Sequence, residues 1–177
     1  MTTFPKDNEI QGVIFSQLKS FPDQRGFFRE VIRKTDPFFG PGSFAQWSHS
    51  KMTQGVVKAW HYHKQQTDWW YLGIGQIEVV LFDNREDSPS YKTKLVFRIG
   101  ESDKYGSDTR EVCFSIPPGV LHGCQVLSEE AHLFYITNQT YNPNDEGRYP
   151  YNDPIVSHTW CQDPITSERD TVRFEPK

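Results

Sequence analysis

The chain has 177 residues, enough for one domain that buries about two thirds of the surface exposed by its unfolded form. A formal net charge of −4 argues against a nucleic-acid-binding or membrane-binding protein, because such proteins carry clusters of Lys and Arg. There are three cysteines without a C-x-x-C spacing, no apolar leader at the N-terminus and no apolar run of membrane-spanning length. We therefore expect a cytoplasmic protein without a disulfide framework.

Short runs of bulky residues separated by turn residues begin near the N-terminus. Residues 10–34 predict two short strands around the turn Pro22–Gly26. Residues 44–50 alternate, with Phe44, Gln46 and two serines on one face. A polar face that points inwards is unusual for a core strand and typical of a pocket wall.

The densest chemistry lies in residues 55–75, GVVKAWHYHKQQTDWWYLGIG. Side chains alternate along an extended strand, so His61 and His63 point to one side while Trp60 points to the other. Asp68 follows, and then a run of bulky residues that ends in two glycines. This order predicts a hairpin of two strands that holds a ligand or a catalytic group.

Further short strands follow in the second half of the chain. They are expected at residues 76–83, 92–98, 111–116 and 131–137. A tight turn at residues 117–119 brings His122 into place. An irregular covering loop is expected at residues 141–163 and a short helix or strand at residues 168–174. Many short strands with almost no helical pattern predict an antiparallel sandwich or barrel. We expect one all-β jelly-roll domain over residues 1–177.

Two short motifs resemble those of the cupins. Gly55, His61-x-His63, Asp68 and Gly75 match the first cupin motif, with Asp in the usual Glu position, and Pro117-x-Gly119-x-x-His122 matches part of the second.

Within the cupins, residues 10–170 resemble most closely the dTDP-4-dehydrorhamnose 3,5-epimerase family. The marks of this family, in chain order, are Asp23-x-Arg25-Gly26-x-Phe28-x-Glu30, Gly55-Val56-Val57-Lys58-x-x-His61, Asp83-x-Arg85 with Ser88-Pro89, Pro118-Gly119-x-x-His122-Gly123, Tyr135 followed by Tyr141-x-Pro143, and Arg169-Asp170.

The resemblance implies a homodimeric isomerase of deoxysugar and O-antigen (lipopolysaccharide) biosynthesis that uses no cofactor and no metal. Its substrate would be a nucleotide-diphospho-4-keto-6-deoxyhexose. The family's usual carrier is dTDP, and the sequence leaves GDP and CDP open.

Carried over by position, His61 is the general base, Asp170 holds it, and Tyr135 is the acid on the other face of the sugar. The resemblance also implies a set of substrate-binding residues: Arg25 and Lys58 at the diphosphate, Phe28, Glu30 and Gln46 near the nucleotide or sugar, and His63, Asp68, His122 and Tyr141 in the pocket.

These roles agree with the chemistry of epimerisation. A hydrogen on a carbon next to a ketone becomes removable because the resulting anion spreads onto the carbonyl oxygen. A histidine suits the base, since its ordinary pKa is about 6.5, and a carboxylate on its far nitrogen fixes the tautomer. Inversion needs a proton from the opposite face, which is the reason for a second residue such as Tyr135.

Two departures from the family leave other functions open. Lys58 replaces an arginine, so a forked phosphate contact becomes a point charge. Asp68 stands where the family carries a lysine beside the ketone, which removes a cation that could stabilise the enolate. The alternatives are a metal-dependent cupin (an oxygenase or sugar isomerase) that uses His61, His63, Asp68 and His122, a 3,4-ketoisomerase, and a non-catalytic sugar-nucleotide binder.

Overall fold

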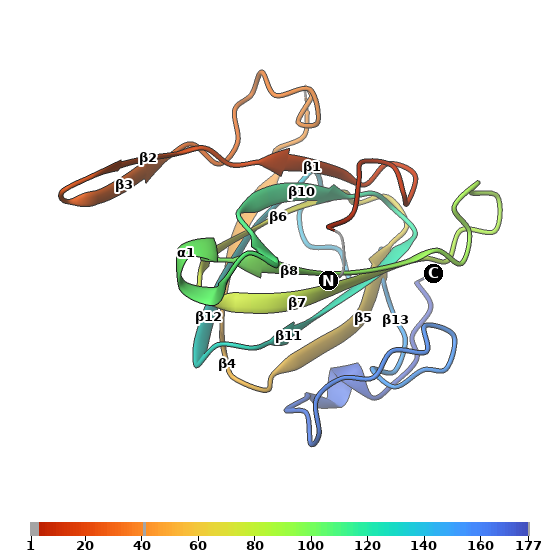
Figure 1. Cartoon of the computed structure of the whole chain (residues 1–177). Coiled ribbons are helices and arrows are strands. Elements are labelled where there is room, and N and C mark those ends of the chain that lie inside the picture. The colour runs from red at the N-terminus through yellow and green to blue at the C-terminus, as the bar shows by residue number, and fades with distance from the viewer. Residues whose placement is uncertain (1–3, 41, 177) are drawn as a thin grey trace.

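Two antiparallel sheets face each other and enclose the core in the computed structural model, which describes residues 4–40 and 42–176 (Figure 1). The first sheet has the order β1 (Ile14–Gln17), β10 (Val112–Ile116), β6 (Asp68–Ile74), β12 (Glu130–Thr137), β4 (Gln46–Thr53). The second has the order β13 (Glu146–Arg148), β5 (Val57–His63), β11 (Val120–Val126), β7 (Gln76–Asp83), β8 (Lys94–Gly100), β9 (Thr109–Arg110), in which only the pair β8–β9 is parallel. The predicted all-β jelly-roll barrel is confirmed.

Helical structure in the described residues is limited to single turns. The helix α1 spans Ser102–Tyr105, and a 3-10 turn, η1, spans Glu168–Asp170. None of these helices is long and apolar enough to cross a membrane.

The space between the sheets is filled by apolar side chains at alternate strand positions. Trp70 and Leu133 from the first sheet meet Val79, Leu81 and Cys124 from the second. Alternation with period two sends the intervening side chains to the outer faces. At one end of the barrel the inward side chains become polar, and this end forms the cavity described below.

The expectation of a hairpin within residues 55–75 is wrong. β5 pairs with β11 and β13, whereas β6 pairs with β10 and β12, so the two strands lie in opposite sheets. The connection crosses from one sheet to the other, and the buried carboxylate of Asp145 holds it by accepting hydrogen bonds from the backbone N–H groups of Gln65 and Gln66, at 2.9 and 3.1 Å. Bulky β-forming residues specify strands, but they do not specify which neighbours those strands take.

The C-terminal segment covers the outer face of β5. Trp60 is fully buried there and packs against Trp160 and Tyr149. The backbone of Trp60 exchanges hydrogen bonds with that of Tyr149 in both directions. Figure 1 shows this segment, in blue, lying beside β5 and β13. It carries η1, and it brings Asp170 behind the strand that bears His61.

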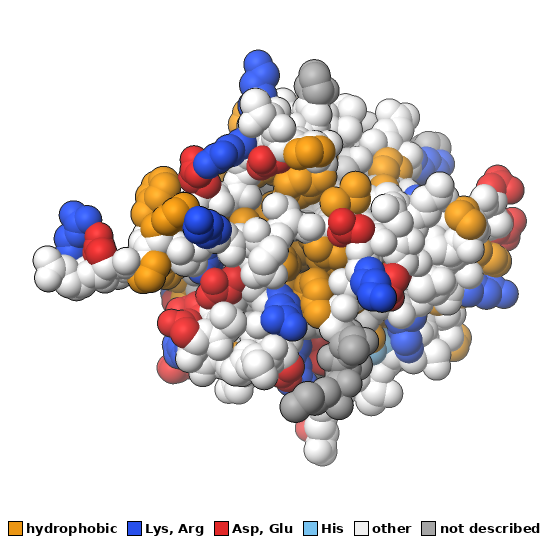
Figure 2. Space-filling model, turned by 45° about the horizontal axis from the view of Figure 1, so that its top comes forward, with side chains coloured by type: hydrophobic (Ala, Val, Ile, Leu, Met, Phe, Trp, Pro, Cys, Tyr) orange, Lys and Arg blue, Asp and Glu red, His pale blue; other side chains and the backbone are white. Residues whose placement is uncertain are grey.

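Strands β2 (Ser20–Asp23) and β3 (Gly26–Arg29) form the expected pair around a turn, and this hairpin, here called the arm, projects away from the barrel (Figure 1). Three phenylalanines of the arm, Phe21, Phe27 and Phe28, are exposed. Figure 2 shows hydrophobic side chains, in orange, gathered where the arm leaves the body.

Candidate active site

A cavity of about 280 Å³ opens at one end of the barrel between the two sheets. Eight of the twelve predicted site residues line it: Gln46, Lys58, His61, His63, Asp68, His122, Tyr135 and Tyr141. Ser50 also lines it, so the polar face of β4 is a pocket wall as predicted. Phe44 was expected on the same face, but it precedes the strand and is exposed.

His61 and Asp170 form the first part of the site. His61 lies on β5 with its side chain 29% exposed, and its Nε2 is 3.6 Å from Oδ1 of buried Asp170. This distance is too long for a hydrogen bond, and among the described residues the nitrogen has no hydrogen-bond partner. A carboxylate at this place favours the tautomer with the proton on Nε2. Nδ1 is then the nitrogen that can accept a proton.

Asp170 is held by hydrogen bonds that do not involve His61. Its Oδ2 accepts from the Ser167 hydroxyl at 2.6 Å and the Ser167 N–H at 2.8 Å, and its Oδ1 accepts from the Ala59 N–H at 3.3 Å. Burial acts to raise the pKa of Asp170, but the neighbouring His61 and the hydrogen bonds from Ser167 outweigh it, so this pKa lies below its ordinary value. Asp170 is therefore a fixed negative charge behind the imidazole.

Tyr135 faces the same cavity from the opposite sheet. On β12 it follows Leu133 by two residues and shares its inward face, while Phe134 and Ile136 line a separate apolar groove on the outer side. A bound molecule in the cavity would therefore have His61 on one side and a phenol on the other.

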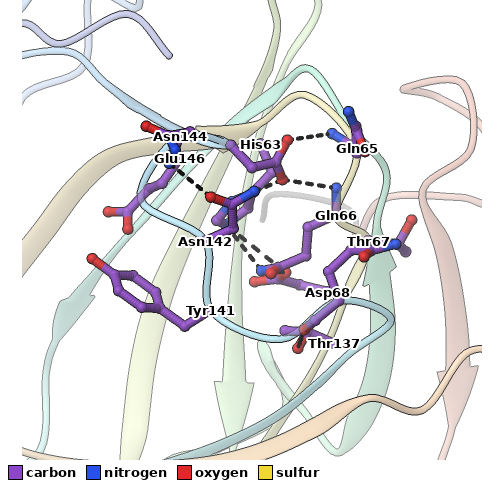
Figure 3. A network of polar contacts seen from close by, with 12 residues as sticks. His63, Gln65, Gln66, Thr67, Asp68, Thr137, Tyr141, Asn142, Asn144 and Glu146 are labelled. Atoms are coloured by element: carbon purple, nitrogen blue, oxygen red, sulfur yellow. Dashed lines mark hydrogen bonds and ion pairs between the residues drawn. The ribbon is translucent and has the colours of Figure 1, made fainter. Parts of the chain in front are cut away.

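A second polar group lies next to His61. His63, Asp68 and His122 each place one nitrogen or oxygen atom within 4.8 Å of those of the other two. Gln66 donates to Asp68 Oδ1 at 2.7 Å and lies 3.2 Å from His63 Nε2. Figure 3 shows Gln66 and Asp68 in contact, with Tyr141 and Glu146 nearby. His61 is outside this group, so only three of the four residues considered for a metal site come together.

Burial changes the protonation of this group. Burial raises the pKa of Asp68, against the opposing effect of the neighbouring His63. Burial, together with the nearby His63 and His61, lowers the pKa of His122 well below its ordinary value. His122 is therefore a neutral imidazole. Burial also raises the pKa of Cys124, another lining residue, to about 12, so its thiol is neutral at physiological pH.

Three predicted substrate-binding residues lie away from the cavity of their own chain. Arg25 is at the tip of the arm, with its side chain 84% exposed, and pairs with Asp23. Phe28 is exposed on the arm, and Glu30, just beyond it, pairs with Arg33. None of the three lines the cavity.

Sequence reasoning did not assign a role to two charged residues at the cavity mouth. Glu146 is buried on β13 and accepts from Arg148 Nε at 2.7 Å, while Arg169 Nη2 lies 3.4 Å from the same carboxylate oxygen. The short sequence Arg169-Asp170 could have indicated Arg169, but Glu146 lies in a segment rich in Asn and Asp that has no periodic pattern.

Comparison with known proteins gives the family. A sequence model described as dTDP-4-dehydrorhamnose 3,5-epimerase matches residues 7–175. The chain belongs to this family. The predicted class, an isomerase of carbohydrates that epimerises nucleotide sugars, is confirmed.

Individual relatives agree with this assignment. The spore coat polysaccharide biosynthesis protein SpsL of Bacillus subtilis is 41% identical over 156 residues, which are 85% of this chain and 96% of SpsL. The dTDP-4-dehydrorhamnose 3,5-epimerase of Pseudomonas aeruginosa is 33% identical over 168 residues, 91% of this chain and 89% of that enzyme. The crystal structure of the epimerase RmlC from Legionella pneumophila, in complex with dTDP-4-keto-L-rhamnose, has a TM-score of 0.80 and 26% identity, covering 93% of this chain and 88% of that chain.

Proposed function

We propose that the protein epimerises a dTDP-linked 4-keto-6-deoxyhexose at C3, at C5 or at both. His61 removes the hydrogen next to the ketone, and Tyr135 returns a proton to the opposite face of the sugar. The observation that carries this proposal is the placement of His61 and Tyr135 on opposite walls of one cavity, with the Asp170 carboxylate behind His61.

The nearby charges fit the two roles. When His61 accepts a proton it becomes a cation, and the carboxylate of Asp170 stabilises that cation at 3.6 Å. Tyr135 lies on the wall opposite this charge and donates its phenol proton to the carbanion. The dTDP carrier is supported by relatives and by the ligand of the Legionella structure.

Exchange of hydrogen with solvent tests the proposal directly. The enzyme is incubated with a dTDP-4-keto-6-deoxyhexose in heavy water, and deuterium at C3 and C5 is followed by NMR. Incorporation with inversion supports epimerisation. No deuterium at either carbon refutes it, and a product with its ketone moved to C3 identifies a 3,4-ketoisomerase instead.

Tyr135→Phe separates removal of the hydrogen from its return. We expect inversion to fall by about 10²–10³-fold, because a general acid contributes roughly 10²–10⁴-fold, while His61 still exchanges the hydrogen on its own face. Tyr71→Phe on the outer face of the same sheet is the matched control and should invert normally. Equal losses of exchange and inversion in Tyr135→Phe would contradict the assignment.

Lys58 is the proposed contact to the diphosphate. It is exposed at the cavity, with Nζ 2.8 Å from the Ser50 hydroxyl. We expect Lys58→Gln to raise KM and to leave kcat nearly unchanged, because a phosphate contact binds substrate and transition state alike. Thermal shifts with dTDP, GDP and CDP compare the carriers, since a ligand raises the melting temperature by mass action.

We also propose that the protein is a homodimer in which the arm reaches the partner. The exposed phenylalanines of the arm support an apolar contact. Such a contact would bring Arg25, Phe28 and Glu30 towards a second copy's cavity. Sedimentation equilibrium measures the mass, and we expect Phe28→Asp to shift it towards that of one chain. A monomeric wild-type protein with full activity would refute this arrangement.

A further inference from the structure

Asp68 places a buried carboxylate at the base of the cavity. It is the first residue of β6, and its side chain lines the cavity wall. Its Oδ1 accepts a hydrogen bond from Gln66 Nε2 at 2.7 Å (Figure 3), and its Oδ2 accepts one from Trp70 Nε1 at 3.2 Å. Because an N–H group points at each oxygen, both oxygens act as acceptors. A carboxylate has about four lone-pair positions, so about two remain for another donor.

The protein supplies no cation to this carboxylate. Among the described residues the only ion-pair distance to Asp68 is 4.0 Å, from His63 Nε2 to Oδ1, which is too long for a hydrogen bond. The Lys and Arg side chains that line the cavity are engaged elsewhere: Lys58 Nζ donates to a serine hydroxyl at 2.8 Å, and Arg169 lies 3.4 Å from Glu146. A buried carboxylate is costly unless enough donors surround it.

The polar neighbours of Asp68 have other partners as well. Gln66 Nε2 donates to Asp68 and also lies 3.2 Å from His63 Nε2, so one amide is shared between the two side chains. Thr137 is opposite Asp68 on β12, but its hydroxyl donates to the backbone carbonyl of Gln139 at 2.6 Å. The remaining acceptor positions of Asp68 are therefore left for a molecule in the cavity.

A 4-keto-6-deoxyhexose, the substrate class of the proposed function, has only one edge that suits such an acceptor. Its C2–C3 edge carries hydroxyl groups, which donate hydrogen bonds, whereas its C5 side carries the ring oxygen and a methyl group, which do not. The ketone oxygen becomes negative when the neighbouring hydrogen is removed, and a carboxylate beside it would oppose that charge. Asp68 therefore suits the hydroxyl-bearing edge and not the ketone.

We propose that Asp68 accepts a hydrogen bond from a hydroxyl on the C2–C3 side of the sugar and makes this hydroxyl a requirement for tight binding. A sugar that lacks the hydroxyl leaves the buried carboxylate short of a donor. Sites built to bond a substrate hydroxyl reject an analogue without it far more strongly than apolar pockets discriminate single methylene groups. Asp68 is thus a specificity-determining residue, and Gln66 and Trp70 orient it. The inference rests on the proposed function for the class of ligand.

Calorimetric titration with sugar nucleotides tests the inference. His61→Asn is the background, so that the ketones bind without reacting. The ligands are dTDP-4-keto-6-deoxy-D-glucose and its 2-deoxy and 3-deoxy forms. We expect at least one deoxy form to bind about 10- to 100-fold more weakly than the parent, which is the contribution of a hydrogen bond to a charged acceptor. The form that loses affinity identifies the hydroxyl.

Asp68→Asn in the same background separates Asp68 from the rest of the cavity. Asn keeps the shape of the side chain without its charge, so the ratio of affinities between parent and deoxy form should fall by about fivefold or more. Asp163→Asn removes an exposed carboxylate instead and is the matched control, in which the ratio should not change. Melting temperatures show whether each variant is folded.

The inference is overturned if the parent sugar nucleotide does not bind, if both deoxy forms bind within about twofold of it, or if folded Asp68→Asn keeps the ratio of its background. Deuterium exchange in the unmodified enzyme tests the proposed function separately. Exchange without discrimination between the sugars refutes only the role of Asp68. Discrimination without exchange supports that role and refutes the epimerase function.

Discussion

Replacing Asp170 by Asn tests the proposed role of the carboxylate behind His61. Two unit charges 3.6 Å apart interact by about 4–5 kcal/mol at an effective dielectric constant of about 20, which corresponds to roughly three decades in rate. Solvent screens part of this charge–charge interaction, because 29% of the His61 side chain is exposed. We therefore expect kcat to fall by about 10²–10³-fold, measured as deuterium incorporation next to the ketone.

The comparison needs a control on the same C-terminal segment. Asp163 is exposed and has a positive φ of 53°, a conformation that Asn tolerates. Asp163→Asn should therefore retain wild-type activity and stability. A folded Asp170→Asn enzyme whose kcat stays within about threefold of wild type would refute the reasoning, because the carboxylate would then not stabilise the protonated base.

Two further predictions concern stability. Gly75 has a φ of +87°, and a Cβ there would lie 2.1 Å from the Glu130 carbonyl oxygen. Gly75→Ala should therefore lower the free energy of unfolding, measured in urea, by more than about 2 kcal/mol. Gly40 has open space around it, so Gly40→Ala should lower that free energy by under about 1 kcal/mol. Burial acts to raise the pKa of Asp83, but hydrogen bonds led by that from Arg85 outweigh it and hold this pKa well below its usual range. The stability that Asp83 contributes is present above its unfolded pKa of about 3.9 and is lost as pH falls towards the folded value. Asp83→Asn should therefore make the free energy of unfolding depend less steeply on pH in acid. An unchanged dependence on pH would contradict this.

Much of the fold follows from local patterns in the sequence. The strands around residues 76–83 and 131–137 were predicted close to their observed bounds, because alternating apolar residues between turn signals specify them locally. The pairing of β5 and β6 was predicted wrongly. Strand partners depend on long-range packing, here on the insertion of β11 beside β5 and of β10 and β12 beside β6.

In the active site, too, local features could be predicted from the sequence, whereas contacts between distant segments could not. His61 and His63 share a face because they are two residues apart on one strand, and this was readable directly. The group of His63, Asp68 and His122 was only partly foreseen, since His61 turns towards Asp170 instead. Asp83 and Arg85, two of the residues by which the family was recognised, hold the turn after β7.

The placement of base and acid on opposite sheets links the active site to the thickness of the barrel. The gap between His61 and Tyr135 is set by the layer of side chains between the sheets, including Trp70 and Leu133. A displacement of about 1 Å can change a reaction rate by roughly 10²-fold. Substitutions in that layer that never touch a sugar could thus alter which carbon is inverted, and the interior of the barrel becomes a place to look for stereochemical selectivity.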